Sequence, residues 1–293
     1  TSFTIIAFPV PAIGELFPEI FKETIRINTL DYELYRDMQQ KIIDVLDTAE
    51  YVEITGKGEN QTNMQVQLAA ISNPEKQTKF ENCVADVNIP LGEVFTSPKL
   101  AGTNGILNVG TVYIGDIQYR NLMMEFKDGR VVSAVCDNFA ENGEIDKEAG
   151  HRLIVQGIMN GHEMLPLGEF AIGTNTTAYV MAEQYGIAGK LPILIAEKMG
   201  PHFAMGDTCY AWAEDSPMYN PDGKEVIARE NEVSAKRKED PSKAYFGCHT
   251  DITIPYRELQ SVAVEKADGT TIPLIEDGRF VLPGTEELNE PFG

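Results

Sequence analysis

The first 55 residues alternate between strand-like and helix-like spacing of hydrophobic positions. The opening TSFTIIAF (residues 1–8) and YVEITG (51–56) are continuous β-prone runs, whereas PEIFKETIRI (18–27) and YRDMQQKIIDVL (35–46) have helical spacing. In the second helix the apolar stripe, with charges between its members, consists of Met38, Ile42, Ile43, Val45 and Leu46. Residues 1–55 are therefore predicted to form a partial α/β segment.

The hydrophobic pattern changes at about residue 56, after which short β-prone runs dominate. Asp-Gly pairs, which favour tight hairpins, lie between several of these runs. The pairs are Asp128-Gly129, Asp268-Gly269 and Asp277-Gly278. Two helical patterns, near residues 145–161 and 178–186, interrupt the strands. We predict an α+β fold in which residues 56–293 form an antiparallel-rich mixed-sheet domain with flanking helices, preceded by the short α/β segment.

Composition and charge narrow the class of protein. With 293 residues and 43% hydrophobic positions, the chain can bury a large core. No apolar run approaches the roughly 20 residues that a membrane span needs, and a net charge of −21 argues against nucleic-acid binding. The charged stretch 221–243 is expected to be an exposed insertion or loop.

The cysteines and the start of the chain suggest its cellular context. Cys83, Cys136, Cys209 and Cys248 are scattered without a zinc-finger spacing, so we expect free thiols in a reducing cytoplasm. The opening residues have neither a basic region nor a cleavage site, which predicts no signal peptide. They also lack an initiating Met, and we expect the chain to be part of a longer protein.

Several acidic and histidine side chains stand in settings that suit metal ligands. His249 and Asp251 are separated by one residue, so they project to one side of an extended chain. Glu93 and Glu169 each follow Leu-Gly and precede apolar residues, a costly place for a carboxylate without a partner. The preceding glycine lets the backbone approach another element closely. His202 begins a small-residue stretch, and Tyr210 follows it. In order, these are the ligand types that a two-metal site requires.

Each of these signals also has an ordinary structural explanation. His249 and Asp251 fit a hydrogen-bonded pair in a sheet, His202 fits a core histidine, and Tyr210 fits an amphipathic aromatic residue. We interpret the remaining histidines, His151 and His162, as structural or solvated residues that flank a surface helix.

The phrases LGEVFTSP, LGEFAIGTN, EKMGPHFAMG and HTD occur in that order. They resemble the metal-binding motifs of thermophilic aminopeptidases, the aminopeptidase T and aminopeptidase S group of metallopeptidase family M29. The resemblance extends from Glu81 to the C-terminus, and its specificity comes from the order of several motifs. The part of the chain before Glu81 is shorter than the N-terminal α/β domain of that family.

The resemblance implies a ligand set and an activity. It implies that the metal ligands are Glu93, Glu169, His202, Tyr210, His249 and Asp251. The implied cofactors are two divalent cations, Co²⁺ or Zn²⁺ with Mg²⁺ as a further candidate, and the implied substrates are peptides with a free N-terminus. A homodimer is also implied.

The mechanism expected from this resemblance uses a water shared by the two cations. Metal binding lowers the pKa of water from about 15.7 toward 7. Glu93 or Glu169 would carry a proton to the leaving amine, and Tyr210 would donate to the oxyanion; we take Glu169 and Tyr210 as the candidate catalytic residues. The alternatives are another binuclear metallohydrolase, a non-catalytic binding module or an inactive homologue.

Overall fold

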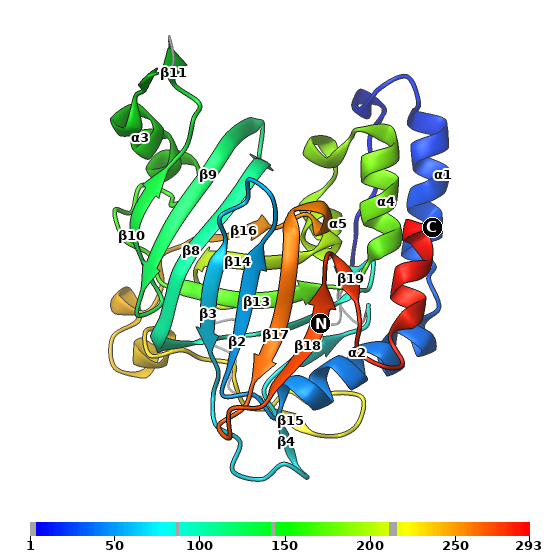
Figure 1. Ribbon diagram of the computed structural model, residues 1–293, viewed down its shortest axis with the longest axis vertical. Coiled ribbons are helices and arrows are strands. Elements are labelled where there is room, and N and C mark those ends of the chain that lie inside the picture. The colour runs from blue at the N-terminus through cyan, green and yellow to red at the C-terminus, as the bar shows by residue number, and fades with distance from the viewer. Residues whose placement is uncertain (1–3, 86–87, 142–143, 211–215) are drawn as a thin grey trace.

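Two antiparallel β-sheets organise the chain (Figure 1). The computed structural model describes residues 4–85, 88–141, 144–210 and 216–293. In Figure 1 the strands of the smaller sheet run behind those of the larger sheet at a steep angle, and α1, α2 and α4 lie to one side of both. The predicted α+β fold, rich in antiparallel sheet with flanking helices, is confirmed.

The larger sheet has eight strands and contains the predicted hairpins. In sheet order they are β10 (Arg130–Val135), β9 (Ile117–Lys127), β8 (Lys99–Ile114), β3 (Asn63–Gln67), β2 (Tyr51–Gly56), β17 (Leu259–Glu265), β18 (Thr271–Glu276) and β19 (Arg279–Phe280). Asp128-Gly129 joins β9 to β10 and Asp277-Gly278 joins β18 to β19. All four residues have positive φ, between 44° and 71°, as a two-residue turn that matches the strand twist requires.

The smaller sheet has five strands and two chemically different faces. In sheet order the strands are β16 (His249–Thr253), β14 (Pro201–Gly206), β13 (Leu167–Gly173), β7 (Glu93–Thr96) and β5 (Glu81–Cys83). Because side chains alternate along a strand, one face is built from Phe170, Ile172, Phe203, Met205 and Ile252, all fully buried in the main core. The other face holds the acidic and imidazole side chains described below.

Three of the helices in the described part of the chain, α2, α3 and α4, begin after a side-chain cap. The helices are α1 (Phe17–Asn28), α2 (Tyr32–Leu46), α3 (Lys147–Gly157), α4 (Thr176–Tyr185) and α5 (Ile193–Ala196). Asp31, Asp146 and Asn175 each accept a backbone N–H in the first turn of the following helix. The predicted stripe of α2 is buried, apart from half-buried Val45. Among the described residues, the helices are all too short or too polar to cross a bilayer.

Short elements complete the chain. Strands β1 (Ile5–Ile6) and β6 (Asn88–Ile89) pair in parallel, as do β4 (Gln77–Thr78) and β15 (Glu225–Val226), while β11 (Ala140–Glu141) and β12 (Glu144–Ile145) form a small antiparallel pair. The 3₁₀ turns are Pro11–Ile13, Ala188–Lys190, Glu197–Met199, Ser234–Lys238, Pro241–Lys243, Tyr256–Glu258 and Glu286–Phe292. Part of the strand predicted at residues 1–8 falls on residues 1–3, outside the described residues.

The stretch 221–243 is more structured than the sequence suggested. It contains β15 and two 3₁₀ turns, and its Val226, Ala228 and Val233 are buried. The prediction of an exposed loop was therefore wrong for these positions. The charged residues of this stretch outnumber its apolar ones, so the pattern did not indicate that a few apolar side chains are buried.

The N-terminal segment packs directly against the rest of the chain. Strand β2 pairs with both β3 and β17 in the larger sheet. The fully buried amide of Gln39 on α2 donates to the Asn82 side chain at 2.6 Å and accepts from the Thr174 hydroxyl at 2.8 Å. These contacts join α2 to β5 and to the turn before α4; the boundary between residues 55 and 56 stays a prediction.

Candidate metal centre

The acidic and histidine side chains singled out in the sequence lie on one face of the five-stranded sheet. In the register, Glu169 on β13 is opposite Ala204 on β14, and Ala204 is opposite Asp251 on β16. His202 is two residues from Ala204 on the same strand face, and His249 is two residues from Asp251. Strand pairing therefore brings these groups together from positions 80 residues apart in the chain.

A small side chain in the middle of this face leaves room for the larger ones. Ala204 is fully buried between the two carboxylate-bearing positions, Glu169 and Asp251. A larger residue there would fill the space toward which both carboxylates and both imidazoles project. The HFAMG stretch after Pro201 thus supplies one ligand type and the space beside it.

Glu169 is the centre of the cluster. Its Oε1 lies 3.3 Å from Nε2 of His202, and its Oε2 lies 3.1 Å from Nε2 of His249. His202 is also 3.5 Å from Oε2 of Glu93, and His249 is 3.5 Å from Oδ1 of Asp251. Four of these side chains are buried, whereas 31% of the His249 side chain is exposed. The cluster is therefore open to solvent on the His249 side.

The other ring nitrogen of each imidazole faces a backbone carbonyl. Nδ1 of His249 is 2.7 Å from the oxygen of Asp207, and Nδ1 of His202 is 3.3 Å from the oxygen of Gly200. These contacts place the proton on Nδ1 in the neutral ring and leave Nε2 as the nitrogen that faces the carboxylates.

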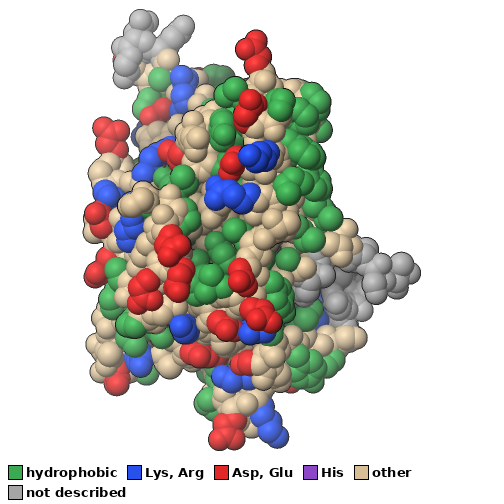
Figure 2. Space-filling model, turned by 90° about the vertical axis from the view of Figure 1, so that its right-hand side faces the viewer, with side chains coloured by type: hydrophobic (Ala, Val, Ile, Leu, Met, Phe, Trp, Pro, Cys, Tyr) green, Lys and Arg blue, Asp and Glu red, His purple; other side chains and the backbone are tan. Residues whose placement is uncertain are grey.

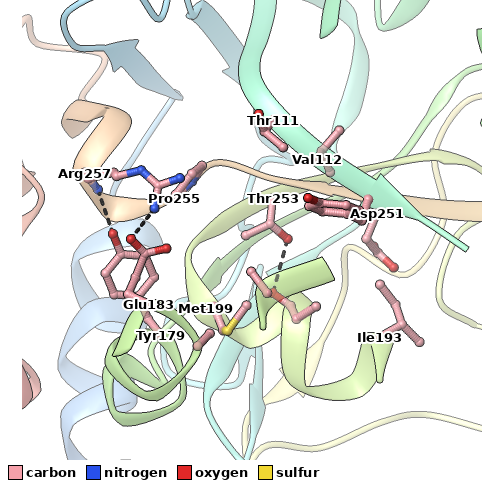
Figure 3. Close-up of a pocket in the computed structure, with 14 residues that line it drawn as sticks. Thr111, Val112, Tyr179, Glu183, Ile193, Met199, Asp251, Thr253, Pro255 and Arg257 are labelled. Atoms are coloured by element: carbon pink, nitrogen blue, oxygen red, sulfur yellow. Dashed lines mark hydrogen bonds and ion pairs between the residues drawn. The ribbon is translucent and has the colours of Figure 1, made fainter. Parts of the chain in front are cut away.

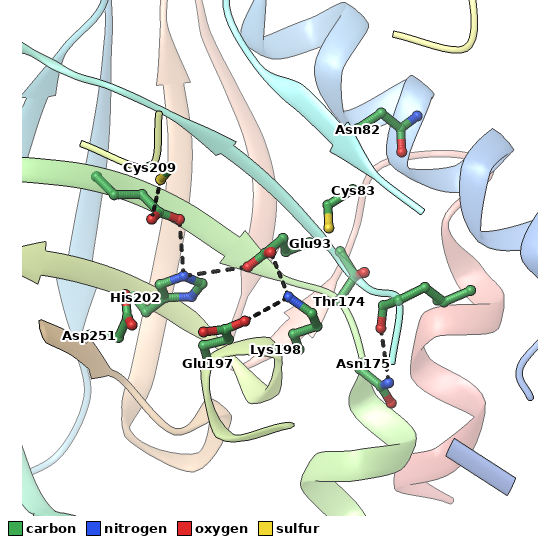
Figure 4. Close-up of polar contacts among 12 residues, drawn as sticks. Asn82, Cys83, Glu93, Thr174, Asn175, Glu197, Lys198, His202, Cys209 and Asp251 are labelled. Carbon is green, nitrogen blue, oxygen red and sulfur yellow. Dashed lines mark hydrogen bonds and ion pairs between the residues drawn. The ribbon is translucent and has the colours of Figure 1, made fainter. Parts of the chain in front are cut away.

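A buried lysine extends the cluster on the Glu93 side (Figure 4). Nζ of Lys198 lies 2.5 Å from Oε1 of Glu93 and 2.9 Å from Oε1 of Glu197, and the Lys198 side chain is fully buried. Burial disfavours the charged ammonium, but the two carboxylates outweigh it and hold the pKa of Lys198 well above its usual value. Lys198 therefore fixes the position of Glu93 and balances part of its charge.

The carboxylates control the protonation of the imidazoles. Burial disfavours the imidazolium of His202, but the hydrogen bond and charge of Glu169 outweigh it and raise the pKa of His202 to about 9. In the same way, Asp251 and Glu169 outweigh burial and raise the pKa of His249 to about 12. Burial would raise the pKa of Glu169, but the two imidazoles hold it well below its usual range. Without a cation, protons on the two rings balance the acidic charge.

The donor set fits divalent cations. Oδ1 of Asp251 is buried and makes no hydrogen bond, which is costly for a carboxylate oxygen unless a cation satisfies it. Glu93, Glu169 and His202 offer ligand atoms that all lie within 4.8 Å of one another, and Glu169, His249 and Cys209 do the same. Imidazole nitrogen with carboxylate oxygen is a donor set of zinc and related ions.

Two glycines allow the backbone around the cluster to pack closely, as the Leu-Gly-Glu phrases predicted. Gly92 has φ of +123°, and a Cβ at this position would lie 2.9 Å from the Cβ of Asn175. A Cβ at Gly168 would lie 2.1 Å from the carbonyl oxygen of Asp207. Neither position could hold a side chain without moving the backbone that carries Glu93 or Glu169.

Tyr210 and Cys209 project in different directions. The Tyr210 hydroxyl donates a 2.6 Å hydrogen bond to Glu81, its ring packs against Phe95, and the Arg229 guanidinium lies over it. The Cys209 thiol instead donates to Oε2 of Glu169 at 2.7 Å. The structure therefore brings five of the six predicted ligands together. The side chain beside them is the Cys209 thiol, whereas the sequence suggested Tyr210.

The remaining histidines lie elsewhere. His151 on α3 contacts the carbonyl of Ala134 and Glu163, and His162 contacts the carbonyl and the ring of Phe246. Both have the structural contacts that the sequence interpretation assigned to them.

Lys198, Glu197 and Cys209 were missed as site residues by the sequence reasoning. A signal for the first two was present, because a Glu-Lys pair in the apolar context ILIAEKMG is unusual unless its charges are neutralised on burial. Burial, opposed by Lys198, raises the pKa of Glu197 to about 7. Cys209 carried no such signal in the sequence.

Two cavities adjoin the cluster at Asp251, and Figure 3 shows the lining of the first. The first, of about 120 Å³, lies between β8, α4 and β16, with the Glu183–Arg257 ion pair at one end. The second, of about 390 Å³, is lined by His249 and Asp251 and shares Tyr113 and Ile193 with the first. A ligand in these cavities would therefore reach the edge of the cluster.

Comparisons with known proteins found a matching family model and similar solved structures. A family model described as thermophilic metalloprotease (M29) matches residues 11–280. The chain is similar in structure to wild-type AmpT from Thermus thermophilus, with a TM-score of 0.57 and 17% sequence identity, over 93% of this chain and 61% of that chain. It also matches 2,5-dihydroxypyridine dioxygenase from Pseudomonas putida KT2440, with a TM-score of 0.49 and 14% identity, over 92% of this chain and 64% of that chain.

The AmpT match shows a shared fold. The chain spans less than two thirds of the length of either solved structure. A search of curated proteins found no match.

Proposed function

The chain belongs to the M29 family of thermophilic metalloproteases, and on that premise we propose that it is a metal-dependent aminopeptidase that releases N-terminal amino acids from peptides. The observation that carries the proposal is the convergence of Glu93, Glu169, His202, His249 and Asp251 on one sheet face, with an Asp251 oxygen left buried and without a hydrogen bond.

These five residues are the proposed metal ligands. Two divalent cations held by them would activate a shared water and polarise a carbonyl, which is the chemistry that such ions supply in two-metal hydrolases. We take the cations to be Co²⁺ or Zn²⁺, with Mg²⁺ as a further candidate.

The chain's own groups would position the substrate and carry protons. Glu93 or Glu169 would take a proton from the attacking water and pass it to the leaving amine, and Glu169 is the one that contacts both imidazoles. Lys198 holds Glu93 in place. Tyr210 would act as an oxyanion donor only by exchanging its hydrogen bond to Glu81 for one to the substrate.

The acidic character of the site supports a substrate with a free amino terminus. Glu93, Glu169, Glu197 and Asp251 surround it, and their carboxylate oxygens are acceptors of the kind that bind an ammonium group. Blocking the amino group should therefore abolish turnover.

Assembly and location follow from the family and from the cysteines. We propose a homodimer because the family resemblance implies one, and a cytoplasmic location because Cys136, Cys209 and Cys248 are free thiols. Figure 2 shows apolar side chains exposed among acidic and basic ones on the face it displays. Leu16, Phe21 and Ile25, in and just before α1, are between 38% and 52% exposed. Such residues are suited to contact with a second copy or with further parts of the protein.

The test is hydrolysis of aminoacyl-p-nitroanilides by purified protein supplied with Co²⁺ or Zn²⁺. We expect turnover of free aminoacyl substrates, none of the N-acetylated forms, and loss of activity with a chelator. Phosphoester hydrolysis without aminoacyl hydrolysis would favour another metallohydrolase. The absence of bound metal, together with no gain in Tm on adding Co²⁺ or Zn²⁺, would favour a non-catalytic module.

A further inference from the structure

We propose that Cys209 is a thiolate ligand of the metal centre, so that one cation is held by sulfur together with Glu169 and His249. The inference rests on the proposed metal-dependent function and adds a ligand to it. It also limits the cation, because thiolate sulfur suits Zn²⁺ or Co²⁺ and not Mg²⁺.

The geometry around Glu169 carries this inference. The Cys209 Sγ is 2.7 Å from Oε2 of Glu169, and the same oxygen is 3.1 Å from Nε2 of His249. The sulfur, a carboxylate oxygen and an imidazole nitrogen all lie within 4.8 Å of one another. Cys209 is exposed as a residue, yet its thiol is directed at the buried carboxylate (Figure 4).

A second observation points to the same place. Oδ1 of Asp251 is buried without a hydrogen bond and lies 3.5 Å from Nε2 of His249. A buried carboxylate oxygen without a hydrogen bond therefore lies beside the imidazole of the three-donor group, as expected next to a cation site.

The neighbouring tyrosine is already engaged. Its hydroxyl donates to Glu81, and its ring lies between Phe95 and Arg229. Coordination by Cys209 replaces the hydrogen bond of its thiol to Glu169: the S–H bond breaks, the proton passes to solvent, and a sulfur–metal bond forms without any change of oxidation state.

Spectroscopy of the metal-loaded protein tests this independently of activity. With Co²⁺ bound, we expect a sulfur-to-cobalt charge-transfer band in the near ultraviolet. With Zn²⁺ bound, X-ray absorption should show a sulfur scatterer at about 2.3 Å. Both signals should disappear in Cys209→Ser and persist in Cys248→Ser, a matched control whose half-buried cysteine is next to His249.

The possible outcomes distinguish failure of the Cys209 assignment from failure of the proposed metal-dependent function. Wild-type protein that binds two cations but shows neither sulfur signal would overturn the assignment of Cys209 and leave the aminopeptidase proposal intact. Wild-type protein that binds no cation would overturn the metal-dependent function itself. A charge-transfer band that survives in Cys209→Ser and is lost in Cys248→Ser would contradict the assignment in favour of the other thiol.

We also infer, from the 120 Å³ cavity, that the enzyme prefers an apolar N-terminal residue of about leucine size. The apolar part of its lining includes Val112, Ala182, Ile193, Ala196 and Met199. The charges at its end, Glu183 and Arg257, neutralise each other. An apolar protein cavity of about 150 Å³ accommodates benzene, so this smaller one suits an aliphatic side chain such as that of leucine.

The cavity lies next to the cluster, and this position connects the inference to the proposed reaction. Asp251 lines both this cavity and the larger one that His249 lines. A residue whose side chain fills the apolar cavity would therefore present its backbone to the cluster. This inference also depends on the proposed function.

Substrate selectivity tests whether the cavity binds the N-terminal side chain of the substrate. We expect kcat/KM for a leucyl anilide to exceed that for alanyl by roughly 50-fold, from burial of the additional carbons. Val112→Phe should reduce that ratio by about tenfold. Val132→Phe, an exposed valine on β10, is the matched control and should leave it unchanged.

Two results would overturn the cavity assignment. One is a preference for lysyl or glutamyl substrates, and the other is an equal loss of leucyl and alanyl activity in Val112→Phe. Failure to hydrolyse any aminoacyl substrate while holding two cations would overturn the aminopeptidase proposal instead.

Discussion

The Nζ of Lys198 lies 2.5 Å from Oε1 of Glu93, and both side chains are buried. Removing one partner of such a pair leaves the other charge uncompensated. Lys198→Met should therefore lower the free energy of unfolding by about 3–5 kcal/mol, measured by urea denaturation of the metal-free protein. Lys57→Met breaks an exposed pair with Asp277 and should have little effect. Equal losses in both variants would contradict the structural role of Lys198.

The four histidines divide into two pairs with different roles. His202→Ala and His249→Ala remove groups of the cluster and should each lower the bound metal, measured by elemental analysis. His151→Ala and His162→Ala remove only structural contacts and should retain it. Loss of metal in the second pair, with retention in the first, would place the cations elsewhere.

Glu169 contacts both imidazoles of the cluster and the Cys209 thiol. Glu169→Gln keeps its shape but removes its charge, so we expect reduced metal content and a fall in kcat of at least about 100-fold. Glu163→Gln, which changes an exposed glutamate beside His151, is the control. Normal metal content and turnover in Glu169→Gln would remove this residue from both proposed roles.

Ala204 keeps open the space between Glu169 and Asp251. Ala204→Val should lower metal occupancy because its added methyl groups enter that space, with a cost in stability of about 1–3 kcal/mol. Ala263→Val, a half-buried strand position of the larger sheet, should keep full occupancy. Full occupancy in Ala204→Val would show that the cations do not use this space.

The stability of the metal-free protein should fall as pH rises from about 6.5 to 9. The pKa of His202 is raised to about 9 and that of His249 to about 12 in the folded state. Between the unfolded value and these values the folded protein binds more protons than the unfolded chain, so increasing pH favours unfolding.

Bound cations would replace those protons and reduce this decline. Thermal melts at several pH values, with and without a chelator, measure the difference. Stability that increases with pH over this range in the chelated protein would contradict the proposed electrostatics.

The sequence could predict those parts of the site that depend on strand alternation. His249 and Asp251 share a face because they are two residues apart in β16, and the Leu-Gly-Glu phrases indicated buried carboxylates with close backbone contacts. The Asp-Gly hairpins and the α2 stripe were equally local signals. Such features depend on residues only a few positions apart, so they can be predicted from the local pattern of residue types.

The parts that the sequence could not predict depend on where the chain leaves regular structure. Gly206 ends β14 with φ of +110°. Beyond it, alternation no longer indicates whether Cys209 or Tyr210 points inward. The contact between Lys198 and Glu93 joins residues 105 positions apart, and only the packing of the Glu197–Met199 turn against β13 and α4 establishes it.

The most direct test of the central claim is an anomalous-scattering map of crystals grown with Co²⁺, recorded at the cobalt absorption edge. The account predicts two peaks enclosed by Glu93, Glu169, His202, His249 and Asp251. Peaks located only at other acidic side chains, or no peak in protein that solution measurements show to be saturated with cobalt, would contradict it.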